Sequence, residues 1–226
     1  MALIILFILY LAGNAWAGSD NGPLHVRNQL PPHLMFLTPV PDSPHLISKD
    51  RLTFSLSADY SSFFVNETSG NGSALIDMEM AVFGLSLKYG VSEELNLSLD
   101  IPLVSMNSGF LDGFLETYHS TFGFPNYGRE ERPKNDFAYV LKNGGQEWFK
   151  SESGGLHLTD SSISAKLSLI DEKNGYSEKD RASHKSLSLS YTLKLPTGNE
   201  DHGFGSGGFD HGLSLLSAYL MPSFAF

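Results

Sequence analysis

His119 and Ser120 have the residue types needed for nucleophilic catalysis, because an imidazole can act as a general base and a hydroxyl as a nucleophile. Both lie in residues 110–122, where apolar residues recur at helical spacing on one face. Neighbours on a helix point in different directions, so Ser120 reaches His119 only after rearrangement. The sequence supplies no oxyanion donor or orienting partner beside them. We therefore interpret this segment as a structural cap, with a lipid hydrolase centred on His119 as the alternative.

A second group of candidate ligands lies in residues 196–212, a segment that contains six glycines. Hard cations need several oxygen ligands held together, and Asp201 and Asp210 are the candidates for a weak Ca²⁺ site. Residues 205–210 resemble one turn of a calcium-binding repeat, but such sites are built from tandem copies and this chain has one. The histidines never show the i, i+4 spacing of zinc-binding helices. A flexible solvated loop is the default interpretation, and no cofactor is indicated.

Composition excludes several functional classes. The formal net charge is −10, so no long-range field attracts the molecule to phosphate, and we expect no nucleic-acid partner. The chain has no cysteine, which excludes disulfides, thiolate nucleophiles and Cys-ligated zinc. Its 226 residues are enough for one large all-β domain with a sizeable core.

The first residues predict export. Residues 2–12 are uninterruptedly apolar, and a small-x-small triplet follows at residues 15–17, the pattern of a secretory signal peptide cleaved before Gly18. The apolar run is too short to span a bilayer of about 30 Å. We divide the chain into a signal peptide (1–17), an extended periplasmic or plug segment (18–50) and a β-barrel domain (51–226).

The strongest signal in the chain is a two-residue alternation of apolar and polar residues, which predicts strands with one apolar face. Residues 76–89 change phase near Val82 and Phe83, where we expect a β-bulge. The glycines at 144 and 145 predict a hairpin within residues 136–149. The alternation is clearest in residues 52–60, 95–103, 162–169 and 184–195.

Two architectures fit such strands: a soluble sandwich with its leucines inside, or a membrane barrel with its leucines against lipid. The polar positions are mostly serine, a poor strand former that suits the crowded, wetted interior of a narrow barrel. The clean runs cover about 9 to 11 residues, the length that a tilted membrane strand needs. Long and short connections alternate, with outside loops expected at residues 66–73, 105–160 and 196–212.

We therefore predict an all-β, antiparallel, transmembrane-type β-barrel with a short helix in its long loop. Between six and eight strands are countable, whereas about eight form the smallest ordinary barrel, so the chain is expected to form either a barrel or an incomplete part of a longer one. The polar set expected to face the lumen is Ser55, Ser57, Ser98, Lys166, Ser186, Ser188, Ser190 and Lys194. The apolar set expected to face lipid is Leu52, Phe54, Leu56, Leu95, Leu97, Leu99, Ile163, Leu167, Leu169, Leu187, Leu189, Tyr191 and Leu193.

Four segments resemble the uncharacterised domain-of-unknown-function family 3187: residues 22–41, 85–103, 109–130 and 193–212. The resemblance implies an exported protein of Gram-negative bacteria that forms an outer-membrane β-barrel. Family members generally continue beyond the point where this chain stops. The family brings no activity and no catalytic residues.

Together these observations predict a passive outer-membrane protein, either a narrow channel or a structural barrel. Its expected partners are outer-membrane lipid and the barrel-assembly machinery, which recognises an aromatic terminus such as residues 224–226. The alternatives are the hydrolase that uses His119 and a secreted, soluble β-sandwich that binds carbohydrate or protein.

Overall fold

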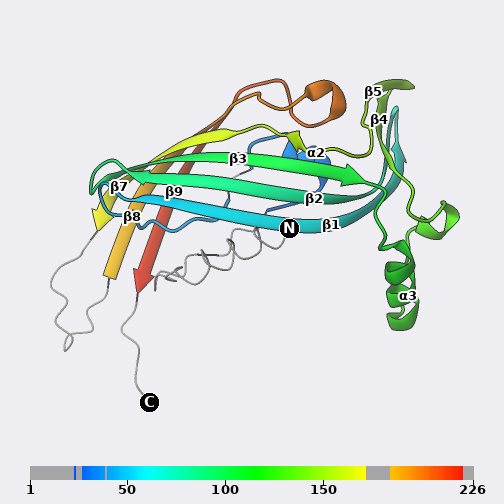
Figure 1. The fold of residues 1–226 in the computed structure, drawn as a ribbon, viewed down its shortest axis with the longest axis horizontal. Helices are drawn as coiled ribbons and strands as arrows, with labels where there is room; N and C mark the ends of the chain where they lie inside the picture. The colour runs from blue at the N-terminus through cyan, green and yellow to red at the C-terminus, as the bar shows by residue number, and fades with distance from the viewer. Residues whose placement is uncertain (1–22, 24–26, 39, 172–183, 221–226) are drawn as a thin grey trace, which may run out of the picture.

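The computed structural model describes residues 23, 27–38, 40–171 and 184–220. One antiparallel sheet of nine strands curves into an open half-barrel (Figure 1). The predicted all-β, barrel-type fold with a short helix is confirmed. No second sheet occurs among the described residues, so they do not form a two-layer sandwich. The expected signal peptide and the aromatic C-terminus lie outside the described residues.

Six strands form the wall, and each is antiparallel to its neighbours. They are β1 (Leu52–Ser69), β2 (Gly72–Gly90), β3 (Leu95–Asn107), β7 (Ser162–Asp171), β8 (His184–Lys194) and β9 (Asp210–Leu220). The predicted hairpin is confirmed as β4 (Ala138–Asn143) and β5 (Gln146–Lys150), and it pairs with the first residues of β2. Strand β6 (His157–Leu158) pairs with β3.

The helices are short. They are α2 (Pro31–Leu34), α3 (Asp112–Phe122) and the 3₁₀ helices η1 (Arg129–Glu131) and η2 (Glu200–His202). The predicted helix at residues 110–122 corresponds to α3. None of the helices in the described part of the chain is long and apolar enough to cross a membrane.

Strands β1 and β2 form one long hairpin. Their pairing runs without interruption from Leu52 opposite Tyr89 to Ser69 opposite Gly72. The turn between them is only two residues, and Gly70 adopts a φ of 56°, which a glycine tolerates without strain. The prediction of an outside loop at residues 66–73 is therefore wrong, because most of these residues belong to β1 and β2. We call the end of the sheet at Gly90 the turn end, and the opposite end, at Lys194, the loop end.

The prediction of a β-bulge near Val82 and Phe83 is also wrong, since the register of β2 with both β1 and β3 is continuous there. The change of phase has another cause. On the concave side of β2, Met78 and Met80 are buried in an apolar cluster at the loop end, whereas Ser86, further along the same face, lines a polar cavity. A register shift does occur in β7, between Ser168 and Ile170.

The apolar cluster occupies the concave side of the loop end. It joins the sheet to α2, to the β4–β5 hairpin and to the segment that carries η2. Its buried members are Met35, Ile76, Met78, Met80, Val82, Val104, Met106, Tyr139 and Phe204.

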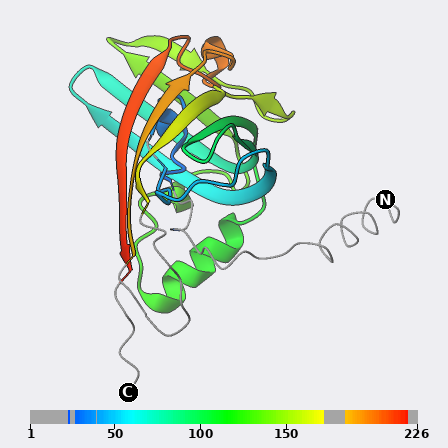
Figure 2. The same cartoon turned by 90° about the vertical axis from the view of Figure 1, so that its left-hand side faces the viewer.

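Residues 27–38 and 40–50, which we call the N-terminal segment, lie on the concave side, inside the curve of the sheet (Figure 2). Near the loop end, the Met35 carbonyl accepts a hydrogen bond from Lys194 Nζ at 2.8 Å. At the turn end, Asp50 N–H donates to the Gly90 carbonyl at 2.8 Å. This N-terminal segment therefore follows the full height of the wall before β1 begins.

Candidate functional site

The candidate site is a cavity of about 540 Å³ between the concave face of the sheet and the N-terminal segment. Cross-strand register puts hydroxyl groups from neighbouring strands on this one face, because Ser98 pairs with Ser164 and Ser190 with Ser214. Six of the residues expected to face the lumen line the cavity: Ser55, Ser57, Ser98, Lys166, Ser190 and Lys194.

The other two residues of that expected set, Ser186 and Ser188, lie buried on the same side of β8. Ser188 Oγ donates a hydrogen bond to the Pro44 carbonyl, so the N-terminal segment covers it. Asn96 on β3 contributes a further contact, because its side-chain amide pairs with the backbone N–H and carbonyl of Ile47 once the amide is oriented to suit them. Strand polar groups thus bind the backbone of the N-terminal segment directly.

The apolar set lies on the opposite, convex face, except that Leu169 lies at the register shift of β7, where Ile170 pairs with Leu187 instead. Leu56 is 73% exposed and Leu215, which the sequence analysis did not assign, is 66% exposed. The exposed members of the expected set are Leu52, Phe54, Leu56, Leu97, Ile163, Leu167, Leu169 and Tyr191. The half-buried members are Leu95, Leu99, Leu187, Leu189 and Leu193.

Charged residues at the cavity are balanced in number. Its lining includes Arg27, Lys88, Lys166 and Lys194, and it includes Asp42, Asp59, Asp100 and Asp160. Lys166 Nζ lies 2.5 Å from Asp42 Oδ2 and donates to the Ser43 carbonyl at 2.7 Å. Sequence periodicity did not reveal Asp42, because its partner is on a strand more than a hundred residues away.

The carboxyl group of Asp42 is tuned by these neighbours. Burial disfavours its charged form, but the hydrogen bond from Lys166 and the positive charges of Lys88 and Lys166 outweigh burial, so the pKa of Asp42 is lowered. Lys88 Nζ lies 3.8 Å from Asp42 Oδ1. The carboxylate therefore stays ionised and holds the N-terminal segment to β7.

A second charged group, at Lys194, joins three segments at the loop end. Lys194 Nζ lies 2.7 Å from Asp160 Oδ2 and 3.1 Å from Asp210 Oδ2. Asp160 also accepts backbone N–H groups of Gly198 at 2.9 Å and Ser206 at 3.0 Å. The connection between β8 and β9 is thus hydrogen-bonded to the wall, which differs from the flexible loop expected for residues 196–212.

These contacts describe how the cavity is built, and comparison with known proteins shows where the chain belongs. The family model described as "Protein of unknown function (DUF3187)" matches residues 1–225. The chain belongs to the DUF3187 family. This confirms the family expected from the sequence. No curated protein and no solved structure matches the chain.

In this DUF3187 protein, the candidate catalytic residues His119 and Ser120 do not interact with each other in the contacts described for them. His119 Nδ1 is 2.9 Å from Asn126 Oδ1, and Ser120 Oγ donates to the Thr117 carbonyl at 2.9 Å. The first contact ties the end of α3 to the following loop, and the second is local to the helix. The structure brings neither side chain to the cavity, whose lining includes neither residue.

Asp201 and Asp210, the candidate ligands for Ca²⁺, likewise do not form a common site. Asp210 Oδ2 accepts the Leu37 N–H at 2.8 Å in addition to its contact with Lys194. Asp201 lies in η2 and is exposed. Within the part of the chain that the structure describes, no group of three or more His, Asp or Glu side chains is arranged to hold a metal ion.

A polar network on the convex side fastens α3 to the wall. Glu79 of β2 accepts hydrogen bonds from Tyr60 Oη at 2.5 Å, from Phe110 N–H at 2.8 Å and from Leu111 N–H at 2.5 Å. Asp112 pairs with Arg129 at 2.5 Å and accepts the Asn135 N–H at 2.7 Å. Glu79 was not predicted from the sequence, because a carboxylate between Met78 and Met80 fits the polar phase of the local alternation.

Proposed function

We propose that this DUF3187 protein is an outer-membrane β-barrel protein with a passive role. Its concave side encloses a narrow, water-filled passage for small solutes, and the N-terminal segment occupies that passage. The observation that carries the proposal is the division of the wall into an exposed leucine-rich convex face and a serine-rich face that lines the cavity. Soluble proteins rarely expose contiguous apolar patches beyond a few hundred Å², whereas lipid is a suitable solvent for such a face.

The two edge strands of the sheet, β1 and β9, each have one side without a partner strand among the described residues. Among the described strands, β1 pairs only with β2 and β9 pairs only with β8. In a bilayer every backbone N–H and C=O needs a partner, because lipid offers none. The membrane form therefore requires further strands that pair with both edges.

Solute preference follows from the lining. Numerous hydroxyl groups and equal numbers of cationic and anionic side chains give the cavity little net charge. We expect such a passage to favour small uncharged, hydroxyl-rich solutes over ions of either sign. The apolar cluster around Met35 and α2 closes its loop end, so a solute crosses only when the N-terminal segment moves.

The test is fractionation followed by reconstitution. We expect the protein in the outer membrane rather than the periplasm, and we expect purification to require detergent. A monodisperse, detergent-free solution of the full chain would contradict the proposal. In vesicles of phosphatidylcholine and phosphatidylglycerol, release of the N-terminal segment is expected to raise permeability to a monosaccharide more than permeability to chloride or sodium.

A further inference from the structure

Helix α3 carries an exposed aromatic stripe that the proposed passage does not explain. Phe114, Tyr118 and Phe122 recur every fourth position and are 64%, 43% and 63% exposed. The ring centroids of Tyr118 and Phe122 are 4.8 Å apart, and those of Tyr118 and Phe114 are 6.2 Å apart. The stripe is therefore a continuous aromatic surface about two turns long.

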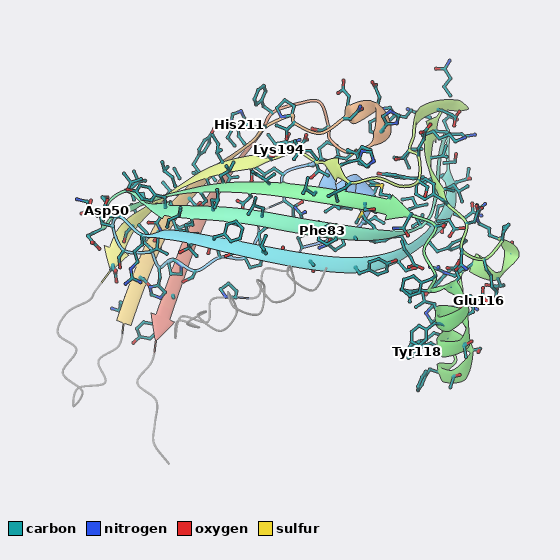
Figure 3. The ribbon with its side chains drawn as sticks, in the orientation of Figure 1. Asp50, Phe83, Glu116, Tyr118, Lys194 and His211 are labelled. Atoms are coloured by element: carbon teal, nitrogen blue, oxygen red, sulfur yellow. The ribbon has the colours of Figure 1, made fainter. Side chains whose placement is uncertain are left out.

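The opposite side of α3 is polar, and it contacts the following loop at Glu116 while Ser120 is exposed. Glu116 Oε2 lies 2.6 Å from Lys134 Nζ of the following loop, and Figure 3 shows Glu116 and Tyr118 on different sides of the helix. An ordinary surface helix of a soluble protein does the reverse, because its apolar side packs on the core and its charged side meets water.

The network around Glu79 and Asp112 keeps the stripe in this position. Glu79 accepts the backbone N–H groups of Phe110 and Leu111, immediately before α3 begins. The buried pair of Asp112 and Arg129 holds the first turn. The aromatic side is thus presented by a helix that is fixed at its N-terminal end and cannot turn over without breaking these contacts.

The position of α3 relates the stripe to the wall. Figures 1 and 2 show α3 outside the curve of the sheet, at the loop end, with its axis across the strand direction. If the strands cross a bilayer, a helix across them lies along the bilayer surface. The rings of Tyr60 on β1 and Phe110 stack at 6.0 Å, so an aromatic contact joins the start of the α3 region to the exposed convex face.

We propose that α3 is an interfacial anchor that seats Phe114, Tyr118 and Phe122 in the boundary between water and the acyl chains of a lipid bilayer. The inference rests on the proposed function, because it takes the strands to span the membrane. Phe and Tyr suit this boundary, and amphipathic helices that lie in its plane insert their apolar side. The position of α3 outside the wall and the contact of Phe110 with Tyr60 on the convex face favour lipid as the occupant over a separate protein partner.

Site-directed spin labelling tests the inference cleanly, because the chain contains no cysteine. Three single variants of the full chain are labelled: Tyr118→Cys on the stripe, Ser120→Cys on the polar side of the same helix, and Leu56→Cys on the convex face of β1. Each is reconstituted into vesicles of phosphatidylcholine and phosphatidylglycerol. Relative collision rates with oxygen, which concentrates in lipid, and with a water-soluble nickel chelate then report the depth of each label.

We expect the label at Leu56 in the hydrocarbon, the label at Tyr118 at the interface and the label at Ser120 in water. If Leu56 is in lipid while Tyr118 and Ser120 are equally accessible to nickel, α3 is not an anchor and the proposed function stands. If Leu56 itself is in water, both fail together. A Phe114→Ser/Phe122→Ser variant provides a second readout, since it should move the Tyr118 label toward water and leave the Leu56 label in place.

Discussion

Lys194 and Asp160 form an ion pair that is almost completely buried, with Nζ and Oδ2 2.7 Å apart and side-chain exposures of 4% and 0%. The lysine also binds the Met35 carbonyl, and the aspartate binds two backbone N–H groups after β8. The pair therefore joins the wall, the N-terminal segment and the β8–β9 connection at one point. Buried charges are costly unless they are paired, so each partner depends on the other.

Replacing Asp160 by Ala should reduce the free energy of unfolding by about 3 kcal/mol, the lower part of the range for breaking a buried pair, because Asp210 still faces Lys194. The matched control is Lys134→Ala. That lysine is 60% exposed in its pair with Glu116, so its loss should cost about 1 kcal/mol or less. Urea unfolding in detergent measures both variants, and similar losses in the two would contradict this account.

Replacing Lys166 by Met should release the N-terminal segment. The variant loses the contacts with Asp42 and the Ser43 carbonyl, while the methionine still fills space on β7. We expect faster proteolysis within residues 27–50 and higher sugar permeability of reconstituted vesicles. Lys142→Met on the exposed end of β4 is the control and should change neither. Unchanged proteolysis in the Lys166 variant would show that this lysine does not hold the N-terminal segment in place.

Acid should release the same segment. The pKa of Asp42 is lower in the folded protein than in the unfolded chain, so its contribution to stability is present above about pH 3.9 and is lost as the pH falls through the lower folded value. The facing charges, Lys88 and Lys166, stay protonated across this range, and Ser43 N–H donates to Asp42 Oδ1 at 2.8 Å.

The measurement is protease accessibility of residues 27–50 between neutral pH and about pH 3, the range in which an aspartate of lowered pKa titrates. Asp42→Asn should show greater accessibility at neutral pH and a flatter dependence on acid than the native chain. If protease accessibility changes equally with pH in the two chains, groups other than Asp42 cause the acid response.

The sequence predicted what depends on local alternation and missed what depends on contacts across the fold. Period-two patterns located β3, β7 and β8, and the glycines at 144 and 145 located a hairpin. The phase change in β2 could not be interpreted locally, because it reflects the burial of Met78 and Met80 in a cluster that also contains Met35, rather than a bulge. The pairing of Asp42 with Lys166 leaves no periodic signal, since the two residues belong to distant segments.

Gly109 is expected to be irreplaceable at the start of the α3 region. Its φ is 69°, and a Cβ there would overlap the side chain of Glu79. Gly109→Ala should therefore weaken the contacts of Glu79 with Phe110 and Leu111. Gly113→Ala is the matched control, because a Cβ there meets open space in the first turn of α3 and should stabilise by at most about 0.5–1 kcal/mol. Thermal unfolding measures both variants, and melting temperatures that are both higher or both lower than that of the native chain would contradict this prediction.

Neighbouring residues on β9 test the assignment of the two faces. Leu215 is exposed on the convex face opposite Leu189, and Ser214 lines the cavity opposite Ser190. Leu215→Lys should reduce the fraction of protein inserted into vesicles, because a lysine facing lipid near the bilayer midplane costs about 2–4 kcal/mol. Ser214→Lys should insert normally and shift the ion preference of the passage toward anions, since it adds a positive charge to a balanced lining. Flotation of vesicles measures insertion, and equal insertion of the two variants would mean that the leucine-rich face does not contact lipid.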